Sequence, residues 1–409
     1  MSRYRVYLKP YIGENVYADE FIDISDDVLS INEISQELDN TTYDIGIFKN
    51  SGFTLTLRND HARFSDSSTS KSMFKYKRQD TIVKVTWDYN NSPLKCGFFS
   101  CGNAVLGEEV TIFEGLLYET SGVSSIEDQK IQFRFSGYES LFDRISVPYS
   151  SITNGDFISD VFYTLLNQSG ITSYLTVDAG NINPGLDFTI DDKTALENQT
   201  VKEALDSKSL LLTSNSVLYI QNNTIYISNR DANATLDYTF YGQASVVGIE
   251  NIIGIKDYRD GLNKVFNYVK WPDTSQLASD ADSIATYGVQ SIEISTDVVS
   301  DSSTSKIDSI LEEIKDEFFF PKRELQLETP LDYGTIDLFL KDKVNIDYPT
   351  IYQSADDNPL PRWGLVTWGN FRWPIGQYSL TIDSADRFKI MGRKINTKDD
   401  TITFYLREV

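Results

Sequence analysis

Apolar and polar residues alternate along most of this chain with the period of two that a strand with one buried face produces. The run FTLTLRND is a clear example, because Phe53, Leu55 and Leu57 alternate with polar residues. The same pattern gives further single faces made of Val83, Val85 and Trp87, of Ile131, Phe133 and Phe135, and of Ile402, Phe404 and Leu406. Half-buried antiparallel strands of this kind build barrels and sandwiches. The pattern therefore predicts a mainly β fold.

Three segments instead show the 3.6-residue period of an amphipathic helix. The second of these three segments begins at the capping box Thr200-x-x-Glu203 and is followed by the hairpin sequence VLYIQNNTIYI. The third helix is predicted over 305–318. In the first, NGDFISDVFYTLLNQSG, Gly170 is a candidate C-cap, and the apolar stripe consists of Phe157, Ile158, Val161, Phe162, Leu165 and Leu166. These helices are few and short, and we expect them to lie on sheets.

The order of these segments divides the chain into three blocks. A length of 409 residues exceeds one ordinary hydrophobic core, so more than one domain is expected. Residues 1–145 are nearly all strand, and residues 146–245 hold two helices and the hairpin. Residues 246–409 return to strands, interrupted by the helix at 305–318.

The charge of the chain limits its partners. Thirty-seven basic and 60 acidic residues give a formal net charge of −23. Binding to nucleic acid by counterion release needs clustered Lys and Arg, so it is disfavoured, and so is binding to an anionic membrane surface. The sequence has no run of about 18 apolar residues and no apolar segment of the kind that signal peptides carry. We therefore expect synthesis in a cytoplasm without membrane insertion.

Residue types that commonly carry catalysis or bind metals are scarce and poorly placed. Cys96 and Cys101 form one C-x4-C pair without further ligands, and His61 lies in a polar turn with no G-x-S-x-G motif. The loop GNAVLGEE has Glu where a phosphate-binding loop needs Lys, and SDADSIATYG lacks most ligands of a calcium loop. Adjacent carboxylates are too common here to indicate a glycosidase: Asp191–Asp192, Glu312–Glu313, Asp356–Asp357 and Asp399–Asp400. We expect no catalytic, cofactor-binding or metal-binding residues.

The stretch PRWGLVTWGNFRWP, which contains the Trp-rich segment (362–374), is the most unusual part of the sequence. It places Trp363, Trp368 and Trp373 beside Arg362 and Arg372. Tryptophan with arginine is typical of a protein interface or of a surface on which sugars stack. The same tryptophans would also suit a domain core. These five residues are the candidate protein-interface site.

Several short motifs, taken in order, resemble the tail-hub (baseplate hub) proteins of tailed bacteriophages. In the first block the resemblance rests on Leu57-Arg58-Asn59 with Phe64, and then on a short helix around Leu141, Phe142 and Asp143. The segment TVKEALD at 200–206, with a hairpin that ends at Arg230, resembles the family's inserted domain.

In the last block the resemblance rests on a smaller set of residues. These are Asn263 and Asn267 in a strand, Ser283, Ile284, Tyr287 and Gly288 in a turn, and Lys343 with Val344 in a later strand. Lys341-Asp342 departs from the Gly-Asp turn that the family usually has, and the Trp-rich segment is particular to this chain. No lysin or peptidase domain is attached, so no wall-degrading activity is carried over.

The resemblance implies two antiparallel β-barrel-like tube domains, 1–145 and 246–409, that flank a small inserted α+β domain at 146–245. It also implies a structural virion protein, not an enzyme, that needs no cofactor. Three chains would form a ring joining the sixfold tail tube, or a distal tail ring, to a threefold spike or tip. DNA would pass through the ring without specific binding, and acids lining the channel would repel its phosphates. Assembly would take place in the host cytoplasm. The alternatives are another tail structural protein, a receptor- or carbohydrate-binding tail protein, and a tail-associated glycosidase.

Overall fold

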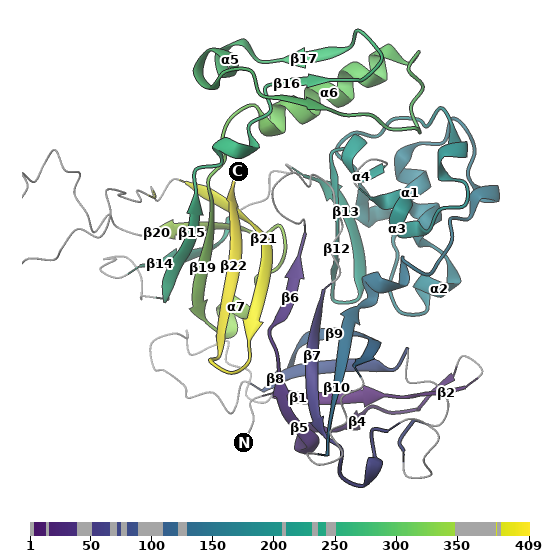
Figure 1. Cartoon of the computed structure of the whole chain (residues 1–409), viewed down its shortest axis with the longest axis vertical. Coiled ribbons are helices and arrows are strands. Elements are labelled where there is room, and N and C mark those ends of the chain that lie inside the picture. The colour runs from purple at the N-terminus through teal and green to yellow at the C-terminus, as the bar shows by residue number, and fades with distance from the viewer. Residues whose placement is uncertain are drawn as a thin grey trace, which may run out of the picture.

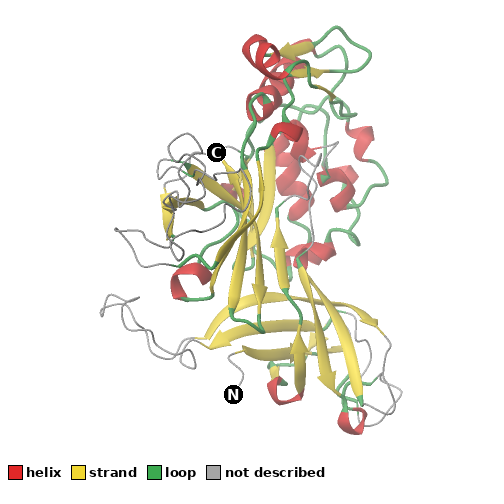
Figure 2. Ribbon diagram, turned by 60° about the vertical axis from the view of Figure 1, so that its left-hand side comes forward, coloured by secondary structure: helices red, strands yellow, loops and turns green. Residues whose placement is uncertain are grey.

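One large sheet dominates the computed structural model, and the predicted mainly β fold with a few short helices is confirmed (Figure 1). The structure describes residues 4–13, 16–38, 51–65, 72–74, 80–88, 109–121, 129–206, 210–230, 236–242, 251–347, 382 and 386–409. In Figure 2 the strands form the middle and the lower end of the molecule, and most helices gather along one side and at the upper end.

The first half of the sheet is antiparallel and is built from the N-terminal strands. Its order is β6-β7-β10-β9-β8-β1-β4, and β5 pairs with β7. A separate small hairpin joins β2 (Tyr11–Gly13) to β3 (Val16–Tyr17). The strands of the first half are β1 (Tyr4–Lys9), β4 (Ile22–Asp23), β5 (Val28–Ile31), β6 (Ile34–Glu37), β7 (Gly52–Arg58), β8 (Ile82–Asp88), β9 (Glu109–Ser121) and β10 (Lys130–Gly137).

The second half continues the same sheet. Its order is β15-β19-β22-β21, β20 pairs with β21, and β14 runs parallel to β20. The short helix α7 (Tyr333–Ile336) follows β19. The strands are β14 (Leu236–Tyr241), β15 (Gly254–Arg259), β19 (Glu324–Pro330), β20 (Lys343–Asp347), β21 (Arg387–Asn396) and β22 (Thr401–Glu408).

Among the described strands, one antiparallel pairing, between β21 and β6, joins the two halves. Ile395 of β21 lies opposite Ile34 of β6, and Gly392 lies opposite Glu37. Among the described residues the strand order runs from β15 to β4 without returning to its start. Closure of either half into a barrel therefore stays a prediction.

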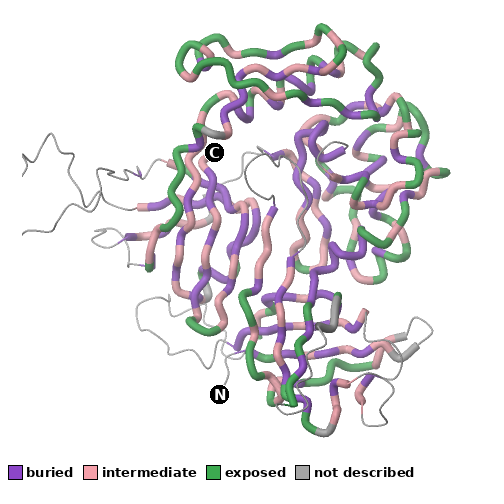
Figure 3. The backbone as a smooth tube through the Cα atoms, in the orientation of Figure 1, coloured by how far each residue is buried: buried purple, intermediate pink, exposed green. Residues whose placement is uncertain are grey.

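The alternation in the sequence matches the burial of the strands. All predicted inward residues are buried and belong to one hydrophobic core: Phe53, Leu55, Leu57, Val83, Val85, Trp87, Ile131, Phe133, Phe135, Ile402, Phe404 and Leu406. In Figure 3 buried and less buried positions alternate along these strands. Burying such side chains stabilises the fold by about 1.5–3 kcal/mol each.

A second hydrophobic core is formed by the middle of the chain. It lies among α1 (Ile158–Leu166), α2 (Ser169–Thr172), α3 (Val201–Leu205), α4 (Leu210–Thr213) and a sheet of β11 (Ile182–Asn183), β13 (Thr224–Asn229) and β12 (Ser216–Gln221). The capping box at Thr200 is confirmed, because both of its hydrogen bonds form with Glu203. The hairpin turns at Asn222 and Asn223, both with positive φ, as a two-residue turn requires.

Two details of the first helix were predicted wrongly. Phe157 is half exposed because its extended backbone forms the N-cap of α1 and bridges to Thr189, so it is not part of the buried stripe. The helix ends at Leu166 with Asn167 as its C-cap, and Gly170 lies within α2 instead. The other five stripe residues are buried.

A further small unit shares the second core. It consists of β16 (Tyr268–Lys270), β17 (Leu277–Ser279), β18 (Ser291–Glu293), α5 (Ala281–Tyr287) and α6 (Thr304–Phe318). The helix predicted at 305–318 is confirmed as α6, one residue longer. The expected turn around Ser283 is the helix α5, which Asp280 caps and which ends at Gly288 with φ 75°. Figure 1 shows this unit at one end of the molecule.

No helix in the described part of the chain is both long enough and apolar enough to cross a membrane.

Candidate functional site

Of the residues singled out from the sequence, some lie outside the described part of the chain and others lie within it. Arg362, Trp363, Trp368, Arg372 and Trp373 lie outside the described residues, and so do Cys96 and Cys101. The structure therefore does not test the candidate interface. The backbone at His61 forms part of a short 3-10 turn, Asp60–Ala62, directly after β7, in agreement with the expected turn.

The adjacent carboxylates that the structure describes have structural partners. Asp191 accepts hydrogen bonds from Lys306 Nζ at 2.5 Å, from Ser303 Oγ at 2.6 Å and from the Ser300 amide at 3.0 Å. Partial burial opposes ionisation, but the bonds from Lys306 and Ser303 leave the pKa of Asp191 lowered. Asp192 caps the next 3-10 turn through Thr194. Asp191 therefore ties the start of α6 to the segment directly before the 3-10 turn Lys193–Leu196.

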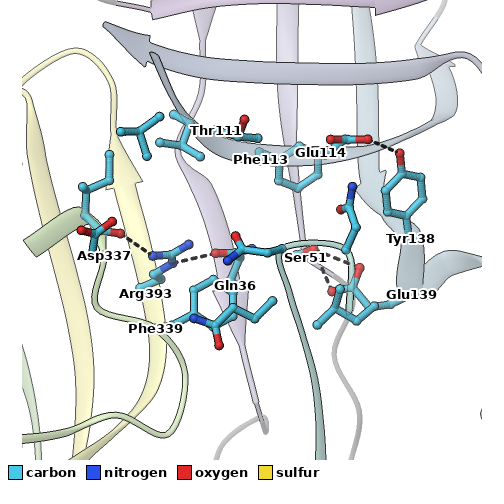
Figure 4. Close-up of a pocket in the computed structure, with 17 residues that line it drawn as sticks. Gln36, Ser51, Thr111, Phe113, Glu114, Tyr138, Glu139, Asp337, Phe339 and Arg393 are labelled. Carbon is cyan, nitrogen blue, oxygen red and sulfur yellow. Dashed lines mark hydrogen bonds between the residues drawn. The ribbon is translucent and has the colours of Figure 1, made fainter. Parts of the chain in front are cut away.

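A cavity of about 150 Å³ lies where three parts of the molecule meet (Figure 4). The first half of the sheet contributes Phe113 and Glu114, and the second half contributes Arg393. The tip of the β12–β13 hairpin contributes Asn222 and Asn223. At this cavity the β12–β13 hairpin lies beside both halves of the sheet.

Arg393 forms the wall of the cavity on the side of the second half. Its side chain is buried and donates to the carbonyls of Ile336 at 3.0 Å and Leu338 at 2.8 Å, and to Gln36 Oε1 at 2.7 Å. The guanidinium also lies over the ring of Phe339, 4.2 Å from its centroid. Burial lowers the pKa of Arg393 to about 10, although nearby carboxylates oppose this. Arg393 thus links β21 to β6 beyond their backbone pairing.

The opposite wall of the cavity contains two buried ionisable side chains, Glu139 and Tyr138. Glu139, in the 3-10 turn Tyr138–Leu141 after β10, accepts hydrogen bonds from Ser51 Oγ at 3.0 and 3.1 Å. Burial raises the pKa of Glu139 to about 6, and these bonds only partly offset the rise. Tyr138 donates a hydrogen bond to Glu114 Oε1 at 2.7 Å. The pKa of the Tyr138 phenol is raised, mainly by burial and secondly by the negative charge of Glu114.

The buried side chains of this cavity hold the junction together. Arg393 donates to Gln36, Glu139 accepts from Ser51 and Tyr138 donates to Glu114, so each of the three has a protein partner. Across the described ranges, no group of three or more His, Cys, Asp or Glu residues is placed to hold a metal ion.

A second polar junction surrounds Glu317, a fully buried residue on α6. Its carboxylate lies 2.8 Å from Lys322 Nζ, 3.4 Å from Arg407 and 3.8 Å from Lys389. Lys389 also donates to the carbonyl of Arg230 at 3.0 Å, at the end of the hairpin. Because a buried charge is costly unless it is paired, this cluster fixes α6 and the hairpin against the strands β21 and β22.

The sequence reading missed Arg393, Glu139 and Glu317. For two of them a signal was present, because each shares the face of buried apolar residues. Glu317 lies three residues after Ile314 on the buried stripe of α6, and Arg393 lies two residues before Ile395 on β21. Such charges need partners from other parts of the chain, which the sequence alone does not place.

Comparisons with known proteins give a fold but no family. No family model matches the chain, and no curated protein does either. Among solved structures, the described fold is similar to that of tail proteins, over nearly the whole of both chains.

Three of these structures are similar at 10% sequence identity. A tail protein from Neisseria meningitidis MC58 superposes with a TM-score of 0.56, covering 99% of this chain and 96% of its own. The 43 kDa tail protein of prophage MuSo2 from Shewanella oneidensis has a TM-score of 0.52, covering 98% and 97%. The prophage tail protein gp18 from Listeria monocytogenes EGD-e also gives 0.52, covering 98% and 94%. The chain therefore has the fold of these proteins.

Proposed function

We propose that this protein is a structural component of a bacteriophage tail. The observation that carries this proposal is the similarity to solved tail proteins, which spans 98–99% of this chain and 94–97% of theirs. A structural role agrees with the buried charges Arg393 and Glu317, which join separate parts of the chain. The protein would be found in the virion tail, after assembly in the host cytoplasm.

More specifically, we propose a hub. Three chains form a ring in which two similar halves per chain give six units, so the ring matches a sixfold tail tube on one side and a threefold tip on the other. The resemblance to tail-hub motifs supports this assignment, as does the division of the large sheet into two halves joined once. A homotrimer is the simplest ring with this symmetry.

In such a ring, the net charge of −23 would keep DNA from binding to the channel wall. DNA that passes through the channel must not adhere to its wall, and carboxylates on the wall repel phosphates within about 8 Å at physiological salt. A channel lined mainly by Lys and Arg in an assembled particle would contradict this part of the proposal.

The proposal is tested by the mass and shape of the purified protein at high concentration. Light scattering combined with negative-stain imaging should show a trimer with an open centre. A protein that stays monomeric at every concentration, and that does not join tail-tube or tip proteins, would contradict the hub. Quenching of tryptophan fluorescence by a saccharide would instead favour a carbohydrate-binding tail protein.

A further inference from the structure

The cavity at the junction contains a buried carboxylate that forms no ion pair with any residue the structure describes. Glu139 is buried, and its side-chain partner is the hydroxyl of Ser51, which lies 3.0 and 3.1 Å from the two carboxylate oxygens. The backbone amide of Glu139 itself also favours the charged form. A hydroxyl is neutral and has one proton to donate, whereas an ionised carboxylate has about four acceptor positions. Glu139 therefore offers an incompletely satisfied acceptor to whatever fills the cavity, because a buried charge is costly unless it is paired.

The guanidinium on the opposite wall does not supply the missing charge. Arg393 and Glu139 lie on opposite sides of the cavity in Figure 4. Arg393 gives its hydrogen bonds to Gln36 and to two backbone carbonyls. The carboxylates that act on Arg393 are those of Asp342 and Asp337. The charge on Glu139 is thus left to be balanced from outside the described residues.

The charges around the cavity favour a cation. Among its described lining residues are three carboxylates, those of Glu114, Glu139 and Asp337, and one guanidinium, that of Arg393. Burial raises the pKa of Tyr138, so this phenol stays neutral at pH 7 and donates to Glu114. Above the Glu139 pKa of about 6, negative charge on the lining therefore exceeds positive charge.

The cavity has a buried floor and an exposed rim. Glu139 and Phe339 are buried, whereas the rim residues Thr111, Asn222 and Asp337 are exposed. A small solute or the end of a long side chain can therefore enter past the rim. A volume of about 150 Å³ leaves room for such a group.

We propose that this cavity binds a primary ammonium group, with the Glu139 carboxylate as its anchor. An ammonium is compact and has three donors, which suits one carboxylate beside neutral oxygens such as those of Thr111 and Asn223. The rings of Phe113 and Tyr138 line the same space, and aromatic rings attract organic cations. The ammonium belongs either to a lysine side chain of a neighbouring protein or to a free amine. The site does not depend on the proposed tail function.

Calorimetric titration with n-butylammonium chloride tests the site. At pH 7.5 and constant ionic strength, the unmodified protein should bind this amine saturably, and its melting temperature should rise with the amine concentration. Glu139→Gln keeps the shape of the side chain without its charge and should weaken binding at least tenfold. Glu197→Gln, on an exposed turn, is the matched control and should bind like the unmodified protein.

A change of pH supplies a second measurement that needs no variant. The amine stays protonated at pH 5 and at pH 7.5, because alkylamines titrate near about pH 10. Glu139, with a pKa of about 6, is mostly protonated at pH 5. Binding should therefore weaken about tenfold between pH 7.5 and pH 5. Binding that is unchanged at pH 5, or that survives in Glu139→Gln, would overturn Glu139 as the anchor.

Further probes decide the chemistry of the ligand. Tetramethylammonium has the same charge but no N–H donor, and potassium chloride supplies an inorganic cation. An equal response to either one would overturn the assignment to a primary ammonium. The absence of any saturable binding would show that the cavity holds water alone and would overturn the site.

The source of the ammonium follows from a blocked lysine, N-acetyl-lysine methylamide. Binding as tight as that of n-butylammonium would support a lysine side chain of a neighbouring protein. Binding at least tenfold weaker would support a free amine. A monomer that binds the amine would support this site and contradict the hub, whereas a trimeric ring that does not bind it would leave the hub standing and overturn the site.

Discussion

The side-chain amide of Asn267 donates a hydrogen bond to Ser283 Oγ at 3.1 Å and another to the carbonyl of Gly288 at 2.8 Å. Its carbonyl oxygen accepts the amide of Gln290 at 2.8 Å. One fully buried residue, directly before β16, thus holds both α5 and the segment that follows it. These residues also carried part of the resemblance in the sequence, and their contact gives that motif a physical reason.

Replacing Asn267 by Leu should lower the free energy of unfolding by about 2–4 kcal/mol, because the Gly288 carbonyl and the Gln290 amide lose their partner inside the protein. Urea denaturation followed by circular dichroism measures the loss. Asn167→Leu, at an exposed position, is the matched control and should change the free energy by less than about 0.5 kcal/mol. Equal effects of the two substitutions would contradict the role of Asn267.

Glu139 should give the protein a pH-dependent stability with an unusual sign. Its pKa rises from an ordinary value of 4.5 to about 6 in the folded protein, so the folded state binds more protons between these values. Stability from this group is therefore present below pH 4.5 and is lost as the pH rises to 6, by about 2 kcal/mol.

The variant Glu139→Gln isolates this effect, because it stays uncharged at every pH. Its free energy of unfolding, relative to the unmodified protein, should increase by about 2 kcal/mol between pH 4.5 and 6 and stay level above that. Glu197→Gln, on an exposed turn, should follow the unmodified protein across the range. A constant difference between Glu139→Gln and the unmodified protein would refute the assignment.

Gly115 on β9 should not tolerate a side chain. A Cβ at this position would lie 2.3 Å from the carbonyl oxygen of Ser136 on the neighbouring strand β10, where backbone cannot move aside. We expect Gly115→Ala to destabilise the protein by about 1–3 kcal/mol in thermal or chemical unfolding. Gly254→Ala is the control, because a Cβ there meets no atom within 4 Å. Similar melting temperatures for both variants would show that β10 can shift.

Lys341 occupies a left-handed backbone conformation with φ 74°, at the position where the sequence departs from the Gly-Asp turn of the tail-hub motif. Its ammonium group donates to Ser228 Oγ at 2.7 Å and to the carbonyl of Asn229. Lys341→Gly and Lys341→Ala both lose these bonds, but only alanine keeps the strain of a Cβ at this φ. Lys341→Ala should therefore be less stable than Lys341→Gly by about 1 kcal/mol in the same unfolding assay. The opposite order would show that the turn is not strained.

The sequence was most informative where structure is local. Alternation around Phe53 or Phe404 depends only on one sheet face, and the capping box at Thr200 depends only on four residues, so both were predicted correctly. The end of α1 was predicted wrongly, because the sequence around Gly170 is compatible both with a C-cap of α1 and with a position inside the next helix, α2. The junction around Arg393 was not predicted at all, since its partners at 36, 336 and 338 come from distant parts of the chain.

The pairing of β6 with β21 has a consequence for the order in which the protein folds. Gln36 and Arg393, which meet there, are 357 positions apart in the sequence. During synthesis, the N-terminal strands emerge early but must wait for β21 and β22 before the second half exists beside them. Because β15 pairs with β19 and β19 pairs with β22, the outer strands of the second half also take shape only at that late stage. The N-terminal strands must therefore stay unaggregated, with the β6 edge unpaired by β21, until almost all of the strands have been synthesised.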